Sequence, residues 1–420
     1  MANVFSKLFK TLGIYTISNI LTSAIPFLLL PFLTNYLKPN DYAIVDLFLA
    51  ASQFAIALIG LNTFSALSRF YFDSDKNNFK SYVGNSVIIL AISAVIILFS
   101  IIIFDTELEK ILKIPKDWLW VIVVYAIGSN IVSTQLVIWQ VKYKSINYGA
   151  FRVLRTLTDI SLSIFFIMFL KFNWEGRILG QTISIIFFAL IAIFFLIKDE
   201  NINIHIDITK IKDLLNFGAP LILHVLGAVI ITYSDRVFIA NYISLESAGM
   251  YSVGYQIGMI VYIIQNSFNQ AWVPWFFERL KINKEIEKIK IIRFTYLYFI
   301  LVFLFALFIS YLAPFIYQIF ISDAYINGLE IVIWITVGFA FNGMYKMVGN
   351  YIFFVKKTYI ISIITIFTAV INIGLNYYMV NKLGAVGVAQ ATAISFLIQF
   401  ILTWIVASRI YKMPWRLKLW

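Results

Sequence analysis

The sequence has 420 residues, of which 61% are hydrophobic and 13% are charged, and its mean hydropathy is +0.88. A soluble globular protein carries about 25% charged residues, so this composition excludes that class and indicates a chain that crosses a membrane many times. The chain has no cysteine and only two histidines, which excludes a disulfide framework, a thiolate metal site and a cysteine nucleophile.

The formal net charge of +12 does not indicate nucleic-acid binding. The basic residues lie in short breaks between apolar runs, which is where membrane proteins keep the positive charges of their cytoplasmic loops. We therefore expect a membrane protein without nucleic-acid partners.

The predicted elements are runs of about 20 apolar residues, the length at which a helix crosses the hydrocarbon core. The first run follows Lys7 and Lys10 and has no small-residue cleavage pattern, so we expect a retained span rather than a signal peptide. Twelve spans are predicted, near residues 12–37, 43–67, 83–104, 118–140, 150–170, 177–197, 218–243, 250–275, 294–320, 329–354, 358–380 and 387–410. The first and ninth are long and contain proline, which favours a tilt or kink over an additional crossing.

Basic residues are distributed unequally between the two sides of these spans. With the N-terminus on side one, 24 of the 33 Lys and Arg residues fall on side one and 7 on side two, while Arg236 and Lys346 lie within spans. Cytoplasmic loops carry the excess of basic residues. Both termini are therefore predicted to be cytoplasmic.

A polar stretch at residues 198–216 separates six spans from six. We expect a cytoplasmic linker that contains a short amphipathic surface helix near residues 208–217. The predicted domains are an N-terminal six-helix bundle (1–197), the linker (198–217) and a C-terminal six-helix bundle (218–420).

Similar short motifs recur in the same order in the two halves. Asn35-Tyr36 between the first two spans parallels Asn241-Tyr242, and Ile183-Ser184 parallels Ile394-Ser395. The pattern favours duplication of one six-span unit, with chance similarity in a sequence rich in Ile and Phe as the alternative. Such repeats share one membrane orientation, and transporters place their substrate path at the interface of the repeats.

Four stretches resemble the polysaccharide-export flippases of the Wzx type. They are PFLLLPFLTNYLKPNDYAIVDLF from Pro26, LNTFSALSRFYFD from Leu61, SDRVFIANYISLESAGMYSVGYQIG from Ser234, and KLGAVGVAQATAIS from Lys382. The resemblance extends over essentially the whole chain, and each piece is a structural turn or an intramembrane charge rather than a catalytic fingerprint.

This resemblance implies membership of the multidrug/oligosaccharidyl-lipid/polysaccharide exporter superfamily. It implies an all-α fold like that of multidrug and toxic compound extrusion (MATE) transporters, with twelve transmembrane helices in two six-helix bundles around a central cavity. It also implies residence in the bacterial inner membrane and a substrate of polyprenyl pyrophosphate carrying an oligosaccharide, such as an O-antigen (lipopolysaccharide) or capsule repeat unit. Membrane lipid and the glycan polymerase machinery are the other expected partners.

Cations inside the membrane are the first candidates for binding a diphosphate. Arg236 and Lys346 lie within spans, and a charge in a span is by default a functional hypothesis. The alternatives are that Arg236 pairs with Asp235 and that Lys346 reaches the cytoplasmic surface. Arg69, Arg152 and Arg155 either set the orientation or recruit the pyrophosphate from the inner leaflet.

Acids within spans are candidates for ion coupling. Asp46, Asp159 and Asp235 occupy such positions, and structural hydrogen bonding is the alternative role. They also keep open a second function, a cation-coupled multidrug or small-molecule antiporter of the same fold.

Asn and Gln side chains within the apolar runs are suited to line a hydrated cavity and to form hydrogen bonds with sugar hydroxyls. The alternative is that part of them form contacts between helices. The cavity candidates are Asn62, Gln135, Gln256, Asn269, Gln270 and Asn342, and further amides include Asn372 and Asn376.

A catalytic role has little support in the sequence. The predicted outward loops have at most about 14 residues and lack histidine, which disfavours a triad or metal site of a membrane-bound polymerase or ligase. There is also no GxxxxGK[ST] phosphate loop. We expect a flippase without cofactor or catalytic metal that exports its substrate by alternating access.

Overall fold

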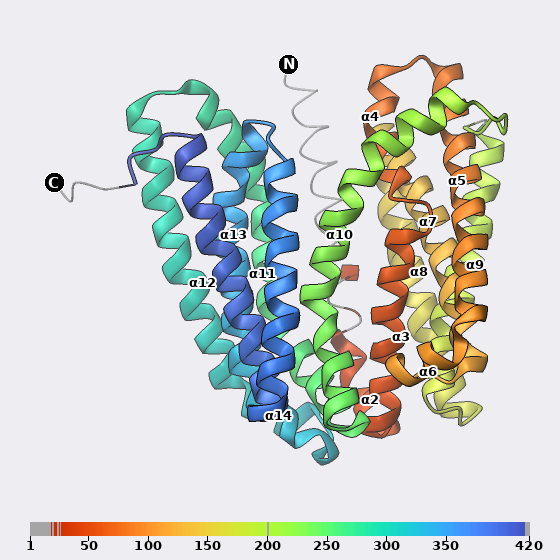
Figure 1. Cartoon of the computed structure of the whole chain (residues 1–420), viewed down its shortest axis with the longest axis vertical. Coiled ribbons are helices and arrows are strands. Elements are labelled where there is room, and N and C mark those ends of the chain that lie inside the picture. The colour runs from red at the N-terminus through yellow and green to blue at the C-terminus, as the bar shows by residue number, and fades with distance from the viewer. Residues whose placement is uncertain (1–17, 19–20, 23–24, 26, 200, 416–420) are drawn as a thin grey trace. The chain divides into compact units, whose positions relative to one another are not determined.

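The computed structural model describes residues 18–415 except 19–20, 23–24, 26 and 200, and these residues are helical apart from short connections (Figure 1). The α-helices are α2 (Leu30–Tyr36), α3 (Pro39–Leu58), α4 (Thr63–Asp73), α5 (Lys76–Ile103), α6 (Asp105–Leu112), α7 (Leu119–Val141), α8 (Ser145–Ile164), α9 (Trp174–Lys198), α10 (Ile208–Tyr242), α11 (Leu245–Ile282), α12 (Glu285–Phe320), α13 (Val332–Phe354) and α14 (Tyr359–Ile410). Three short segments complete the order: η1 (Lys116–Trp118), the π-helical η2 (Phe165–Phe169) and η3 (Asp323–Ile331). The all-helical fold class is confirmed for this part of the chain.

Short polar side chains begin several of these helices. Asp75 precedes α5 and accepts a hydrogen bond from the backbone N–H of Asn78 at 2.8 Å. Ser244 precedes α11 and accepts from the backbone N–H of Ser247 at 3.0 Å. Each cap satisfies an amide that has no partner within its own helix, so these breaks set where the apolar helices start.

Nine helices in the described part of the chain are long and apolar enough to cross a membrane. One of them, α14, has 52 residues with a non-helical backbone at Gly384, and the predicted spans 358–380 and 387–410 lie on either side of this kink. Helix α8 with η2 corresponds to the predicted span 150–170, and part of the predicted span 12–37 lies outside the described residues. The count is compatible with twelve crossings.

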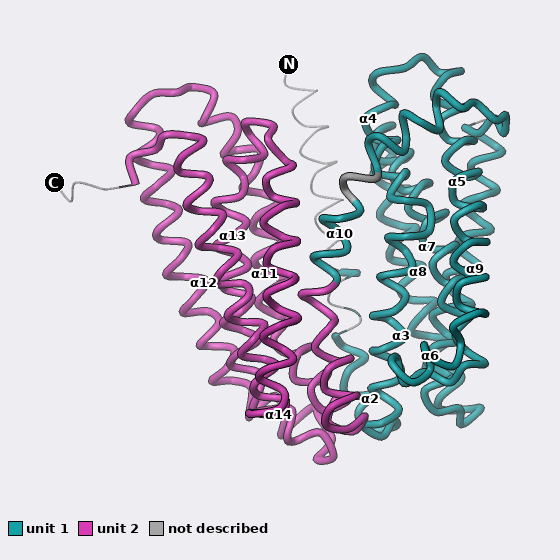
Figure 2. The backbone as a smooth tube through the Cα atoms, viewed as in Figure 1, with its two compact units in different colours: residues 1–229 teal, residues 230–420 magenta. Residues whose placement is uncertain are grey.

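The chain divides into two compact units, residues 1–229 and 230–420, here called the N-terminal and C-terminal units (Figure 2). The division falls inside α10, which is continuous from Ile208 to Tyr242. The expectation of a separate short helix near residues 208–217 was therefore wrong: that segment is the first part of α10. No proline or glycine interrupts it before Gly218, so the helix continues without a break.

The core of the N-terminal unit joins five helices. Leu67 of α4, Val83 of α5, Ile138 of α7, Leu196 of α9 and Leu214 of α10 form one buried cluster. A side chain from the start of α10 thus completes the packing of α4, α5, α7 and α9. A second cluster surrounds Trp139, whose ring packs edge-on against neighbouring phenylalanines.

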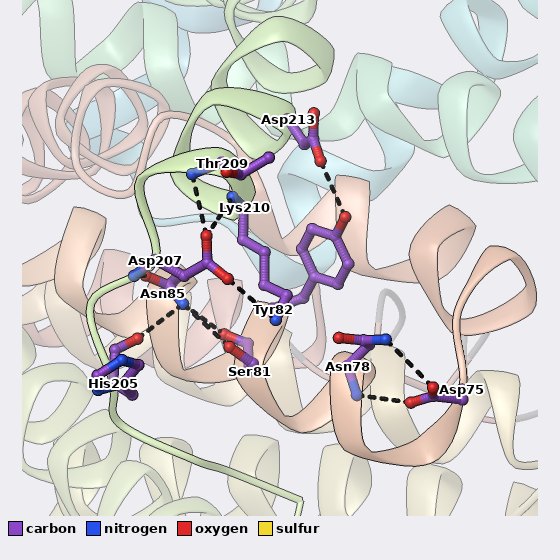
Figure 3. A network of polar contacts seen from close by, with 10 residues as sticks. All are labelled: Asp75, Asn78, Ser81, Tyr82, Asn85, His205, Asp207, Thr209, Lys210 and Asp213. Carbon is purple, nitrogen blue, oxygen red and sulfur yellow. Dashed lines mark hydrogen bonds and ion pairs between the residues drawn. The ribbon is translucent and has the colours of Figure 1, made fainter.

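The connection from α9 to α10 is held to α5 by three hydrogen bonds, and Figure 3 shows the Asn85 side chain, which forms two of them, with His205 and Asp207. We call residues 201–207 the strap. Asn203 N donates to Lys80 O at 3.1 Å, and the Asn85 amide donates to His205 O at 3.0 Å. A Cβ at Gly84 would lie 1.9 Å from the carbonyl oxygen of Asn203, so only glycine lets the strap approach α5 this closely.

The strap ends in a helix cap. The Asp207 carboxylate accepts from the backbone N–H groups of Thr209 at 3.0 Å and Lys210 at 3.3 Å, and it pairs with the Lys210 ammonium at 3.2 Å. Tyr82 of α5 donates to Asp213 on the next turn at 2.9 Å (Figure 3). The start of α10 is therefore held to α5 by side chains as well as by backbone contacts.

In the C-terminal unit, helices α11, α12, α13 and α14 pack together with the end of α10. A Cβ at Gly254 of α11 would lie 2.1 Å from the carbonyl oxygen of Gly328 in η3, and one at Gly258 would lie 2.5 Å from Ile335 of α13. Small residues permit close approach of helices in membrane proteins. Helix α12 runs through Pro314 as one helix, as expected for a proline that adds no crossing.

Candidate functional site: a buried polar cluster in the C-terminal unit

Asp235 lies at the centre of a buried polar cluster. It stands on α10 and none of its surface is exposed. Its Oδ2 accepts hydrogen bonds from the Tyr251 hydroxyl at 2.5 Å and the Thr392 hydroxyl at 2.8 Å, and its Oδ1 accepts from the Asn376 amide at 3.0 Å. Tyr251 belongs to α11, while Asn376 and Thr392 lie on opposite sides of the α14 kink. Three neutral donors from separate helical segments thus converge on one acid.

A second layer of hydrogen bonds continues from this acid along α14. The Asn376 amide also lies 3.1 Å from Ser234 Oγ and 3.2 Å from Asn372 Oδ1. Ser234 donates to Asn372 Oδ1 at 3.0 Å, and the Asn372 amide donates to Ser395 Oγ at 3.2 Å. Asn372, Asn376 and Ser395 are fully buried. The layer gathers carboxylate, amide and hydroxyl oxygens, the atoms that bind hard cations.

Arg236, the next residue on α10, is surrounded by tyrosine rings. Only 3% of the residue is exposed, and its guanidinium carbon lies 3.7 Å from the centre of the Tyr255 ring. The rings of Tyr233 and Tyr251 lie 5.5 and 5.6 Å away. One guanidinium nitrogen also donates to the carbonyl oxygen of Thr232 at 2.5 Å. Aromatic faces attract a cation without neutralising its charge, so this arrangement keeps a positive group within a membrane-spanning helix.

Helices α11 and α13 share a polar ladder that includes Lys346. Its three rungs each have a donor–acceptor distance of 3.0 Å: Gln265 to Asn342, Lys346 to Asn266, and Asn350 to Asn269. Residues 342, 346 and 350 are four apart and so lie on one face of α13. The Lys346 ammonium is also 4.6 Å from the centre of the Tyr262 ring. The predicted residues Asn269 and Asn342 thus lie in one stripe with the predicted Lys346.

Asp159, a predicted coupling acid, forms an ion pair in the N-terminal unit. Its carboxylate lies 2.5 Å from a guanidinium nitrogen of Arg177, and the same nitrogen donates to Ser163 Oγ at 2.6 Å. A Cβ at Gly180 would lie 2.4 Å from Ser163 Oγ, so the glycine lets α8 and α9 approach closely enough for the pair to form. No pattern in the sequence identifies Arg177 as the partner of Asp159.

The remaining predicted charges also belong to the N-terminal unit. Arg69 forms an exposed pair with Asp73 at 3.2 Å and lies over the Phe217 ring. Arg152 donates to the Tyr148 hydroxyl at 3.1 Å, one turn earlier on α8. Each of these two arginines thus contacts a residue one turn away on its own helix.

Arg155 and Asp46 are partly buried. The backbone carbonyl of Arg155 accepts from the Ser184 hydroxyl at 3.0 Å, which links α8 to α9. The roles of both side chains stay predictions.

The other predicted amides differ in their surroundings. Asn62 has a φ of +54° and accepts from Ser65 Oγ at 2.8 Å, so it shapes the turn before α4. Gln135 of α7 is fully buried, and neither of its side-chain polar atoms has a hydrogen-bond partner among the described residues. Gln256 is partly buried on α11, and Gln270 is exposed on the same helix.

Several residues of the buried cluster were not singled out from the sequence. Tyr251, Thr392 and Ser395 are polar contacts of Asp235 and its neighbours. One signal could have found the last two: Thr392, Ser395, Gln399 and Thr403 recur every three or four residues in an apolar span, which places them on one helix face. Within the described residues, no group of three or more His, Cys, Asp or Glu side chains could hold a metal ion.

Comparison with known proteins gives a family and a fold. A family model described as "Polysaccharide biosynthesis protein" matches residues 8–280. An "Uncharacterized membrane protein" of Haemophilus influenzae is 26% identical over 375 residues, which cover 88% of this chain and 89% of the relative.

The solved structures that are similar include a multidrug resistance MATE family transporter of the MOP superfamily in two conformations. The inward-facing conformation has a TM-score of 0.71 at 18% identity and covers 94% of each chain. The outward-facing conformation has a TM-score of 0.67 at 18% identity and covers 96% of this chain and 95% of the other. The MATE-like fold expected from the sequence is confirmed.

Proposed function

Because this chain belongs to the polysaccharide biosynthesis protein family and has the fold of MOP-superfamily transporters, we propose that it is a flippase for a lipid-linked oligosaccharide. The transported molecule is a polyprenyl pyrophosphate that carries a glycan unit, and it moves from the cytoplasmic to the outer leaflet. The chain is a multi-pass membrane transporter; the lipid-linked glycan and the direction are our proposal.

The observation that carries this proposal is Arg236, a nearly fully buried cation within a membrane-spanning helix. A charge in hydrocarbon costs about 2.5 to 3.5 kcal/mol on insertion scales, so such a residue is expected to face protein or water and to serve a function. The surrounding tyrosine rings leave the guanidinium positively charged. A guanidinium can donate two parallel hydrogen bonds to two oxygens of a phosphate.

The ladder on α11 and α13 suits the glycan. Asn266, Asn269 and Asn342 present amides along one stripe, and Lys346 adds a second cation. Amides donate to and accept from sugar hydroxyls, whereas the polyprenyl tail can remain in lipid. We propose that Arg236 and Lys346 bind the diphosphate, and that Arg69, Arg152 and Arg155 contribute to its recruitment.

The membrane potential favours export of such a substrate. Moving about two negative charges out of a negative interior gains about 2.3 kcal/mol per charge at 100 mV, or about 4 to 5 kcal/mol in total. We propose alternating access as the mechanism, with no nucleotide hydrolysis.

Asp235 is the strongest of the three predicted coupling acids. Asp159 is paired with Arg177, whereas Asp235 accepts only neutral donors among the hydrogen bonds given above. Its surrounding oxygens suit a proton or a small monovalent cation. The same acid supports a second candidate, a cation-coupled antiporter for small molecules, because an acidic site suits a cationic substrate.

The test is flipping of a fluorescent polyprenyl-pyrophosphate oligosaccharide in proteoliposomes. We expect Arg236→Gln to lower the rate by at least about 10-fold, a loss of about 1.4 kcal/mol, because the diphosphate loses its buried cation. Arg236→Lys retains the charge and is expected to retain part of the rate. Lys382→Gln, which neutralises an exposed lysine of the same unit, is the matched control and should flip like the unmodified protein.

A folded Arg236→Gln/Lys346→Gln protein that flips at the unmodified rate would contradict the assignment. Efflux of cationic dyes in a pump-deficient host that is lost in Asp235→Asn and retained in Arg236→Gln would instead favour the antiporter.

A further inference from the structure

Asp235 accepts hydrogen bonds from three side chains but has no exposed surface. A carboxylate that is closed to solvent exchanges a proton through a neighbouring group that can both donate and accept one. Its donors are the hydroxyls of Tyr251 and Thr392 and the amide of Asn376. An amide nitrogen donates without accepting, so the two hydroxyls are the candidate routes to this acid.

A cavity of about 390 Å³ reaches one of these two hydroxyl-bearing residues. Among its lining residues are Tyr251 of α11, Asn327 and Glu330 of η3, and Leu383 and Ala385 beside the α14 kink. The second hydroxyl donor, on α14 beyond the kink, is not among the described residues that line this cavity. Tyr251 therefore belongs both to the cavity wall and to the hydrogen bonds of the buried acid.

The cavity lies at the end of the C-terminal unit where α10 joins α11, α12 joins α13 and α14 is kinked (Figure 1). These connections are on the side opposite to the one that the basic residues predict to be cytoplasmic. The kink is at Gly384, whose φ of +59° favours glycine, and it brings its neighbours Leu383 and Ala385 to the cavity wall. Glu330 and Leu383 are exposed, so the cavity is open to the surface at this end.

The polar part of the lining suits a hydrated entrance. Ser247, Asn327 and Glu330 offer hydroxyl, amide and carboxylate groups to water. One water molecule takes up about 30 Å³ in the liquid, so the cavity has room for several. The exposed Glu330 carboxylate attracts cations to its mouth.

The titratable groups around Asp235 come from two helices. Arg236 attracts it from the same helix, to which Tyr233 also belongs. Helix α11 contributes Tyr251 and Tyr255. The contacts from α14 are the neutral amide and hydroxyl described above. Any titration of Asp235 therefore takes place beside Arg236, and Tyr251 connects it to the cavity.

We propose that this cavity is the outward entrance for the coupling proton and that Tyr251 passes the proton to Asp235, an inference that rests on the proposed coupling role of this acid. A proton from water in the cavity joins the Tyr251 hydroxyl oxygen while the hydroxyl proton already there moves to Asp235 Oδ2 over 2.5 Å. One tyrosine O–H bond forms and one breaks, the carboxylate becomes a carboxylic acid, and no electrons are exchanged. Release of the proton is the reverse of this step.

The experiment follows the carboxylic-acid C=O band of Asp235 by infrared spectroscopy and measures its rate of exchange with D₂O in the purified full-length protein. Asp235→Asn, which lacks the band, assigns it. We expect Tyr251→Phe to slow the exchange at least about 10-fold, because a positioned side chain contributes about 100-fold or more to a proton transfer and water replaces part of this. A merely structural role of the hydroxyl would shift the pH midpoint of the band and leave the rate unchanged. Tyr351→Phe, which removes a buried hydroxyl without a hydrogen-bond partner among the described residues, is the matched control.

The cavity can also be blocked reversibly, because the chain has no cysteine of its own. Asn327→Cys places a thiol on the cavity wall, and a bulky thiosulfonate reagent attached there should slow the exchange until it is removed by reduction. Glu246→Cys, at an exposed position that does not line the cavity, is the control and should exchange at the unmodified rate after the same treatment. A membrane-impermeant thiosulfonate should label Asn327→Cys in intact cells, because the cavity faces outward.

These measurements use no glycan substrate, so their failure is distinguishable from a failure to flip a lipid-linked oligosaccharide. The route is overturned if the Asp235 band is absent at every pH at which the protein is folded. It is equally overturned by an exchange rate that is unchanged in Tyr251→Phe or after modification of Asn327→Cys, and by labelling of Asn327→Cys in broken cells alone.

Discussion

The two units stabilise their buried charges in different ways. In the N-terminal unit, Arg177 and Asp159 neutralise one another directly at 2.5 Å. In the C-terminal unit, Asp235 accepts from hydroxyls and an amide, and Arg236 lies over aromatic rings. The Arg177–Asp159 pair joins two helices and neutralises both charges, whereas the hydrogen bonds to Asp235 come from neutral groups and the aromatic rings around Arg236 carry no compensating charge, although Asp235 and Arg236 also attract one another.

This difference bears on where a charged substrate or ion can act. We expect the Arg177–Asp159 pair to be structural and the Asp235–Arg236 segment to be functional. The matching neutral substitutions in the two units, Asp159→Asn and Asp235→Asn, separate these roles because each keeps the shape of the side chain and removes its charge.

The largest effect on stability is expected for Asp159→Asn. Removing the carboxylate leaves the buried Arg177 guanidinium without its counter-charge, and breaking a buried pair costs about 3 kcal/mol; the partial exposure of Asp159 places the value at the lower end of the known range. Unfolding in mixed micelles measures it. The double variant Asp159→Asn/Arg177→Gln should recover part of the loss, and a single variant within experimental error of the unmodified protein would show that the pair is not structural.

A smaller loss of stability is expected for Asp235→Asn. The Tyr251 and Thr392 hydroxyls can still donate to the amide oxygen, and the hydrogen bond from Asn376 is lost, so the free energy of unfolding should fall by about 1 kcal/mol. Transport should nevertheless lose its dependence on the coupling ion. A loss of stability as large as that of Asp159→Asn would remove the contrast between the units.

The smallest effect is expected for the half-buried pair of Asp207 and Lys210. The hydrogen bond from Lys210 holds the pKa of Asp207 below its ordinary value. The contribution of Asp207 is therefore present at neutral pH and is lost as the pH falls below about 4, the unfolded value, through the lower folded pKa. The protection factors for amide hydrogen exchange at Thr209 and Lys210 should fall over this range, and Asp207→Asn, which keeps a cap, should abolish the pH dependence of this protection.

Much of the fold can be predicted from the sequence because its physical basis is local. Apolar runs of spanning length, separated by caps such as Asp75 and Ser244, specify helices and their ends. The continuity of α10 could not be predicted, because the polar residues near 208–217 resemble a surface helix until Leu214 is seen packed against Leu67 and Val83. That contact joins segments more than a hundred residues apart in the sequence.

The candidate site was predictable only where charge is rare. Arg236 and Lys346 are conspicuous because cations within spans are costly, and Asp235 for the same reason. Tyr251 could not be singled out, because the chain has 24 tyrosines and a tyrosine within a span does not by itself indicate a functional site. Likewise, the partner of Asp159 could not be identified, because the closeness of α8 and α9 depends on Gly180 and not on the two charges themselves.

The packing of Leu214 also has a consequence for biosynthesis. The first unit of the chain is complete only when the beginning of α10 has been synthesised, since Leu196, Leu67 and Val83 bury their apolar surfaces against it. A fragment that stops at residue 197 would leave this surface open at the end of the bundle where the strap should lie. We expect such a fragment to aggregate or to be degraded, and one that continues through residue 229 to accumulate in the membrane.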